Sequence, residues 1–345
     1  MDDYPVRSSA DGSVGGVVCH AVPLLTEGFE GEARLLRLVQ GGLEDLARQC
    51  PDAPWKRGRT SFYLSMPDVN RLTSGAELLF DEEARKEIQA TESTQDPDAD
   101  PERARQVLKA GAQLAGWHSK PDLKSSTTTG NSGVAEALDR ARQDLSRGEC
   151  EIAIVGGVDS LLDEDTLSWL EATGRLKTPD MASGLQPGEA CGFVVLETQD
   201  GAAKRNARTL GRLDAVSFGE QTRPIFLGEQ PSRAPVVDLL VRASQTTPWG
   251  GQSPNWLIHD LSGETYGATE WGNTLFGLAT HSVTLADPKV WFSTPSFGYT
   301  GAATGAIQLC VAVQAFARSY SPAKSVALIS SSDARMRGCV VLSQT

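Results

Sequence analysis

Apolar side chains recur along the chain at spacings that predict a series of helices and strands. In Glu32–Gln49 and Ser132–Arg147 they return every three or four residues, which is typical of a helix with one buried face. Residues 15–22 and Arg59–Ser65 predict strands, and Pro101–Gly116 predicts a further helix after an acidic, proline-rich stretch. The chain is therefore expected to mix helices and strands throughout.

One order of elements occurs twice. Gly130–Gly133 opens the helix Ser132–Arg147, and Gly298–Gly301 opens a run at Ala302–Arg318 that is apolar nearly all round. Each helix leads into a continuously apolar strand that ends in small residues and an aspartate, and then into a closing strand; the four strands are Ile152–Val155, Gly192–Leu196, Val326–Ile329 and Gly338–Leu342. This internal repeat predicts two homologous halves that pack together, with each half burying a layer of the other.

We place the boundary between these halves in the polar stretch Thr198–Arg208, so that residues 1–200 form the first half and 201–345 the second. A helix that is apolar on every side, as at Ala302–Arg318, belongs inside a protein. Strands without polar residues are expected to be covered on both faces. Both features predict central helices held between two sheets.

The stretch Pro187–Glu197, read with the duplication, resembles the thiolase-like condensing enzymes, specifically the β-ketoacyl-(acyl-carrier-protein) synthases. The resemblance covers Thr127–Glu197 and Trp256–Leu342. It implies an α/β fold in which two mixed five-stranded sheets sandwich buried central helices, in α-β-α-β-α layers. It also implies a dimer in which the strand at Lys124–Thr129 pairs across a two-fold axis.

The amino-acid composition and net charge limit the kinds of molecule that the protein is expected to bind. The 345 residues are 40% apolar, enough for a substantial core, and 32 basic against 44 acidic side chains leave a formal charge of −12. This charge argues against a nucleic-acid or anionic-membrane surface. The N-terminus lacks a basic start and an apolar stretch, and no window approaches a membrane span, so we expect a soluble cytoplasmic protein.

Neither the cysteines nor the glycines indicate a bound metal or cofactor. The six cysteines stand singly and read as free thiols in a reducing compartment, and no metal-ligand spacing is present. Val155–Val158 follows a strand but lacks the glycine pattern of dinucleotide-binding loops. We therefore expect no metal and no cofactor.

The resemblance places the family's nucleophilic cysteine at Asn131, counting back from Gly148 and Gly156. No cysteine lies between Cys50 and Cys150. A condensing enzyme needs this thiol at the start of a buried helix, where the helix dipole and backbone N–H groups favour the thiolate. The sequence indicates that condensation through a thioester is lost. Asn131 also suits a structural role, because asparagine is a preferred helix N-cap.

The other family positions have changed as well. Asp260 stands where the first active-site histidine is expected, with His259 as an alternative one residue away, and Tyr299 replaces the second histidine. Thr294 matches the family's lysine, and Ala334–Arg337 replaces its glycine-rich gate. A carboxylate at residue 260 would repel the malonyl carboxylate that it should help to decarboxylate.

Two hypotheses of different classes follow. The first is a non-condensing β-ketoacyl synthase-like protein, a pseudoenzyme that serves as an interaction or accessory subunit of an acyl-carrier or secretion-linked system. It would form a homodimer, or a heterodimer with another ketosynthase-like chain, and an acyl carrier protein is a further candidate partner. Chain-length-factor subunits, as inactive ketosynthase copies, pair with active synthases in this way.

The second hypothesis is an acyltransferase or acyl-thioester-binding protein. It uses Ser132 as an oxygen nucleophile, with a base from His259, Asp260 or Tyr299, or it binds the thioester in a modified ketosynthase pocket. Arg335 and Arg337 are candidates for binding the phosphate of a phosphopantetheine arm or of coenzyme A, and they also suit ordinary surface charges. The polar cluster Asp260–Trp271 is interpreted as a repurposed ligand pocket or as a network that fills the vacated site.

Overall fold

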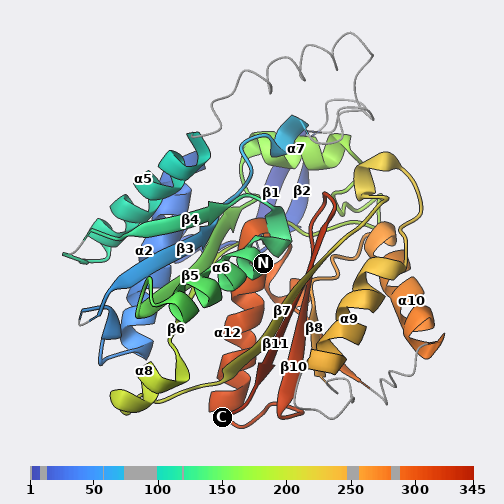
Figure 1. Cartoon of the computed structure of the whole chain (residues 1–345). Coiled ribbons are helices and arrows are strands. Elements are labelled where there is room, and N and C mark those ends of the chain that lie inside the picture. The colour runs from blue at the N-terminus through green and yellow to red at the C-terminus, as the bar shows by residue number, and fades with distance from the viewer. Residues whose placement is uncertain are drawn as a thin grey trace.

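Two mixed β-sheets enclose a pair of central helices in the computed structural model (Figure 1). The structure describes residues 2–7, 14–56, 58–73, 99–118, 120–246, 256–280 and 288–345. Across these ranges no helix is both long and apolar enough to cross a membrane.

The N-terminal half contains a four-stranded sheet with the order β4-β3-β5-β6, in which only β6 runs antiparallel to its neighbour. Its strands are β3 (Thr60–Ser65), β4 (Leu123–Thr127), β5 (Ile152–Ser160) and β6 (Glu189–Leu196). Helices α2 (Gly31–Gln49) and α5 (Ala99–Leu114) cover one face and α6 (Gly133–Arg147) covers the other. Alternate residues of β5 enter the two cores, Ile154 on the side of α2 and Val155 on the side of α6.

The C-terminal half contains a five-stranded sheet with the order β7-β11-β10-β8-β9. Its strands are β7 (Arg212–Glu220), β8 (Trp256–His259), β9 (Lys289–Phe292), β10 (Ser325–Ser331) and β11 (Met336–Ser343). Helices α9 (Ala234–Thr246) and α10 (Thr265–Thr280) pack on its outer face, and α12 (Thr304–Ala317) packs on its inner face (Figure 1).

Helices α6 and α12 lie together between the two sheets and share one apolar core with both of them. A Cβ added at Gly305 would lie only 2.8 Å from the Cβ of Val134, so the close approach of the two helices requires a glycine at this position. The predicted α/β fold with two mixed sheets around central helices is confirmed. The small helix α8 (Gln199–Lys204) occupies the stretch where we placed the boundary between the halves, and that boundary stays a prediction.

The two sheets differ in one strand. In the C-terminal half β7 pairs along the whole of β11. The corresponding β2 (Val14–Cys19) instead forms an antiparallel hairpin with β1 (Asp2–Arg7), and the chain meets the start of β6 only at a bridge between His20 and Gly188. The N-terminal sheet therefore has four strands within the described ranges, where five were expected.

The other α-helices in the described ranges are short and lie in connections between these layers. They are α1 (Pro23–Thr26), α7 (Glu164–Ala172) and α11 (Thr294–Phe297).

Candidate functional site

The two central helices begin with the same local structure, as the repeated glycine motifs predicted. Gly130 has φ +60° and opens a 3-10 turn, Gly130–Ser132, before α6. Gly301 has φ +46° and opens a corresponding turn, Gly301–Ala303, before α12. Positive φ favours glycine at both points. The position matched to the family's nucleophile, Asn131, thus lies in a buried turn at the start of a central helix.

The side chain of Asn131 contacts the residue that matches the first active-site histidine. Its Nδ2 donates a hydrogen bond of 2.9 Å to Oδ2 of Asp260, and the backbone N–H of Ser331 donates to the same oxygen at 2.7 Å. Asp260 follows β8, and Ser331 ends the parallel neighbour β10, so the carboxyl ends of two adjacent strands meet at the turn. The N-cap of α6 is Ser132 and has no side-chain capping bond, so Asn131 does not serve as the predicted N-cap.

The residue that matches the second histidine belongs to a different network. The hydroxyl of Tyr299 donates a 2.7 Å hydrogen bond to Oδ1 of Asp333. Burial, and then the nearby Asp333 carboxylate, raise the pKa of Tyr299 well above its usual value, so its phenol stays neutral. The three positions matched to the family site are therefore divided, with Asn131 bonded to Asp260 and Tyr299 bonded elsewhere.

Arg175 holds this second network together. Its guanidinium binds both oxygens of Glu264, at 2.8 and 3.1 Å, and both oxygens of Asp333, at 2.7 and 2.8 Å. It also lies 5.4 to 5.9 Å from the ring centroids of Trp169, Phe226 and Tyr299, within cation–π range.

Burial alone would raise the pKa of Asp333, but the charge and hydrogen bonds of Arg175 outweigh it and hold that pKa below its ordinary value. No signal in the sequence indicated Arg175, because its partners Glu264 and Asp333 stand 89 and 158 residues away.

Of the two arginines proposed to bind phosphate, one is internal. Arg337 is 1% exposed, and its Nε donates to the carboxylate of Glu270 at 3.0 and 3.2 Å. Its Nη1 donates to backbone carbonyls, including that of Ser332 at 2.7 Å. Arg337 is therefore not an ordinary surface charge. Arg335 is exposed, and phosphate binding there stays a prediction.

Ser132, the alternative nucleophile, has no exposed surface. Its Oγ lies 3.1 Å from the carbonyl oxygen of Ser330 and 3.2 Å from that of Met336, and its N–H donates to Oγ of Ser332 at 3.2 Å. No hydrogen bond joins its hydroxyl to His259, Asp260 or Tyr299 in the part of the chain that the structure describes.

His259 lies beside Asp260 without a regular hydrogen bond to it. The Nδ1 atom of His259 is 3.3 Å from Oδ1 of Asp260, yet neither atom has a hydrogen-bond partner within the described ranges. The imidazole packs edge-on against Trp271, with centroids 4.8 Å apart. Thr294, in the place of the family's lysine, donates its hydroxyl to the carbonyl oxygen of Leu261.

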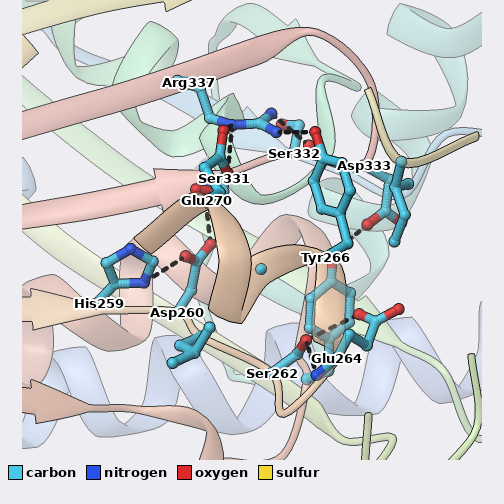
Figure 2. Close-up of a pocket in the computed structure, with 14 residues that line it drawn as sticks. His259, Asp260, Ser262, Glu264, Tyr266, Glu270, Ser331, Ser332, Asp333 and Arg337 are labelled. Carbon is cyan, nitrogen blue, oxygen red and sulfur yellow. Dashed lines mark hydrogen bonds and ion pairs between the residues drawn. The ribbon is translucent and has the colours of Figure 1, made fainter. Parts of the chain in front are cut away.

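Some of these groups line a small cavity of about 40 Å³, whereas Asn131 and Ser132 are not among its lining residues (Figure 2). Its lining includes His259, Asp260, Glu264, Tyr266, Tyr299 and Arg337. A water molecule needs roughly 10–15 Å³ measured in this way, so the cavity accommodates only a few water-sized groups. Pockets for drug-sized ligands are about 300–1,000 Å³. The cavity is therefore smaller than a pocket for a drug-sized ligand, and both interpretations of the polar cluster stay predictions.

The six cysteines are all free, and those with a perturbed pKa are perturbed in the unreactive direction. Burial raises the pKa of Cys150 and Cys191, that of Cys310 to about 11 and that of Cys339 to about 12. Reactive thiols have a lowered pKa. Within the described ranges no cluster of His, Cys, Asp and Glu side chains has the arrangement of a metal site.

Comparison with known proteins agrees with this architecture. Residues 124–202 match the family model of the β-ketoacyl synthase N-terminal domain. Polyketide synthase ThaG of Burkholderia thailandensis is 30% identical over 148 residues, which are 40% of this chain and 3% of that protein. Cyclo-acetoacetyl-L-tryptophan synthase of Aspergillus oryzae is 38% identical over 93 residues, 24% of this chain and 2% of that protein. The chain thus matches only a few per cent of the length of these relatives.

Solved structures are similar over nearly the whole chain. The oxazolomycin ketosynthase domain of Streptomyces albus has a TM-score of 0.67 at 15% identity, over 98% of this chain and 67% of that chain. A type II polyketide synthase acyl-carrier protein in complex with its ketosynthase gives 0.68 at 15% identity, over 96% and 88%. These likenesses establish the thiolase-like fold of ketosynthases. With the family-model match, they show that the chain contains a ketosynthase-like domain.

Proposed function

We propose, starting from this ketosynthase-like domain, that the chain does not condense acyl groups and acts as an accessory or interaction subunit of an acyl-carrier-dependent system of the polyketide synthase type. The observation that carries the proposal is the amide of Asn131, the residue matched to the family's nucleophile, which is bonded to Asp260. An amide group has no thiol or hydroxyl with which to form an acyl-enzyme intermediate.

The partners of the missing thiol support the same proposal. Decarboxylative condensation develops negative charge on an enolate oxygen, which has to be met by hydrogen-bond donors. Asp260 offers a carboxylate, which accepts hydrogen bonds and repels an anionic substrate. The hydroxyl of Tyr299 already donates its hydrogen bond to the carboxylate of Asp333. Neither group can replace a histidine that donates to an oxyanion.

The volume of the cavity beside Asp260 and Tyr299 supports the same proposal. A cavity of about 40 Å³ cannot contain a malonyl thioester together with the end of a phosphopantetheine arm. The Arg175 network occupies space beside the cavity and would lose buried ion pairs if it opened.

The open edge of the N-terminal sheet is evidence for binding of a partner chain. Strand β4 is outermost, pairs with β3 on one side, and its residues are half-buried or exposed. Such an edge can accept a strand from a second chain. We propose that residues 124–129 pair in this way in a homodimer or in a heterodimer with another ketosynthase-like chain. One structural neighbour, at 19% identity and a TM-score of 0.53, is a ketosynthase/chain length factor, and another contains an acyl-carrier protein.

The experiment combines an acylation assay with a measurement of mass in solution. The purified chain is incubated with acyl- and malonyl-loaded carrier protein beside an active ketosynthase, and intact-protein mass and carbon dioxide release are followed. We expect no adduct, no decarboxylation and no chain extension, while light scattering gives a dimer. Extension of the acyl chain would refute the proposal. An adduct that disappears in Ser132→Ala would replace it with the acyltransferase hypothesis.

A further inference from the structure

The open edge of β4 continues into one flank of α6. The start of the helix is tied to the end of the strand, because the hydroxyl of Thr127 donates a 3.0 Å hydrogen bond to the carbonyl oxygen of Gly133. Most of α6 is buried between the sheets, but one row of polar side chains at every third or fourth residue is half-buried or exposed. The row consists of Glu136, Arg140, Gln143 and Arg147.

Opposite charges stand at the two ends of this edge. Lys124 is exposed near the start of β4, where the register with β3 shifts by one residue, so that the lysine lies in a β-bulge. At the other end, Thr129 follows the strand and its hydroxyl donates a 3.1 Å hydrogen bond to Oε2 of Glu136. The edge therefore presents a cation at one end and a carboxylate at the other.

Neither charge has an opposite charge as a partner among the described residues. Burial raises the pKa of Glu136, and the hydrogen bond from Thr129 offsets this only in part. A half-buried carboxylate without a cation is costly, and a nearby cation would relieve that cost. The exposed Lys124 has no carboxylate partner in the same ranges.

A lysine in a bulge on an edge strand normally prevents unselective strand pairing. A chain that pairs beside Lys124 has to bring a negative charge to this point, because otherwise the ammonium group would lose water without compensation. The edge of β4 is therefore selective, and the charge of the incoming chain decides whether it fits.

We propose that Lys124 and Glu136 select the partner at this edge by forming a reciprocal ion pair, and that the partner is a second copy of this chain. The inference rests on the pairing proposed above for residues 124–129. A two-fold axis makes such a contact self-complementary, so antiparallel pairing of this segment with its own copy places residue 124 of one chain opposite residue 129 of the other.

Because Thr129 holds Glu136, each Lys124 then meets the Glu136 of the second copy, and the ion pair forms twice. Parallel self-pairing would instead bring two Lys124 side chains together. A different ketosynthase-like chain fits equally well only if it carries both charges at the same two places. Charge thus distinguishes the homodimer from the heterodimer, which the open edge alone does not.

The test is a charge exchange in the full chain, with the Kd of the dimer measured by sedimentation equilibrium. Lys124→Glu and Glu136→Lys each place like charges together at both contacts, and we expect each to raise Kd at least about tenfold. An equal mixture of the two variants restores both ion pairs and should form a 1:1 dimer with nearly the original Kd. The double variant should also dimerise with itself. Lys109→Glu, at an exposed lysine on α5, is the matched control and should leave Kd unchanged.

A second pair of variants covers the case in which Glu136→Lys does not fold. Lys124→Gln and Glu136→Gln remove the charges at similar size, and their effects on Kd should not add, because each abolishes the same ion pair. A chain that stays monomeric or pairs only with a different chain overturns the inference. An unchanged Kd for Lys124→Glu, or a mixture that does not recover, overturns it as well.

The acylation assay on the same samples separates this inference from the proposed function. A dimer that condenses acyl groups would refute the proposed function and leave the ion pair intact. A monomer that does not condense would do the reverse.

Discussion

Each half has an aspartate near the end of its equivalent strand. The surroundings shift the pKa values of these two carboxyl groups in opposite directions. Asp159, near the end of β5, binds Arg71 at 2.7 Å and accepts the N–H of Ala302 at 2.9 Å, which secures the turn before α12. Burial nevertheless raises its pKa, and the Arg71 charge does not fully compensate. The pKa of Asp333 is lowered, because Arg175 binds both of its oxygens.

The two aspartates thus differ in their partners: Asp159 fixes a turn, whereas Asp333 belongs to a cluster of ion pairs. Asp159 accepts the N–H of Ala302 and so fixes the turn Gly301–Ala303 before α12. In the cluster of Asp333, Arg175 comes from the N-terminal part of the chain, and both acids, Asp333 and Glu264, come from the C-terminal part. The same position in a repeated motif therefore fixes a turn in one half and joins a network of ion pairs in the other.

The largest expected effect comes from removing the arginine of each pair. Arg175→Ala leaves Glu264 and Asp333 without their buried counter-charge, and we expect a loss of about 3–5 kcal/mol in the free energy of unfolding. Arg71→Ala should cost less, about 1–3 kcal/mol, since the Arg71 side chain is 22% exposed and Asp159 can take up a proton. Urea denaturation of both variants measures the contrast, and equal losses would contradict it.

A second test addresses the contact between Asn131 and Asp260. Asn131→Asp places two carboxylates against each other in a buried turn, and we expect a loss of about 2–4 kcal/mol at neutral pH. The double variant Asn131→Asp, Asp260→Asn restores one donor and one acceptor and should regain most of that loss. A double variant as unstable as the single one would show that the hydrogen bond is not the cause.

The pH dependence of stability should separate the two aspartates. Asp333, with a lowered pKa in the folded state, contributes stability above its unfolded pKa of about 3.9, and this contribution is lost as pH falls through the folded value. Asp159, with a raised pKa, contributes stability below about 3.9 that is lost as pH rises through its folded value.

Urea midpoints between pH 3 and 7 are the measurement. We expect Asp333→Asn to flatten the acid side of the stability profile and Asp159→Asn to steepen it. Parallel profiles for the two variants would remove the proposed contrast between the halves.

The smallest effect is expected at Ser132, whose counterpart in the second turn is Ala303. Ser132→Ala makes the first turn resemble the second and removes a hydroxyl that contacts two carbonyl oxygens. We expect a loss of about 1 kcal/mol and no change in any acylation assay. A loss of acyl transfer with unchanged stability would instead identify Ser132 as a nucleophile.

Most of the fold could be predicted because it follows from local patterns. The three-to-four spacing located α2 and α6, and the all-round apolar run located α12 between the sheets. The glycines at 130 and 301 marked both turns. The hairpin of β1 with β2 was missed, because an isolated apolar strand does not specify which neighbour it joins.

The site could be predicted only in part. Counting along the family's motif placed Asn131 and Asp260 at one site, and the structure joins them by a hydrogen bond. The roles of Arg175 and Arg337 could not be read from the sequence, since a buried arginine looks like a surface one until its carboxylate partners are known. Those partners lie 67 to 158 residues away.

The placement of α12 has a consequence for how the protein unfolds. Because both sheets contribute to its apolar surroundings, neither half can retain its core after the other has opened. A chain cut within α8 should therefore yield two fragments that are unstable apart and regain structure only when mixed. Stability in this molecule is shared between the halves, and a single cooperative transition is its expected signature.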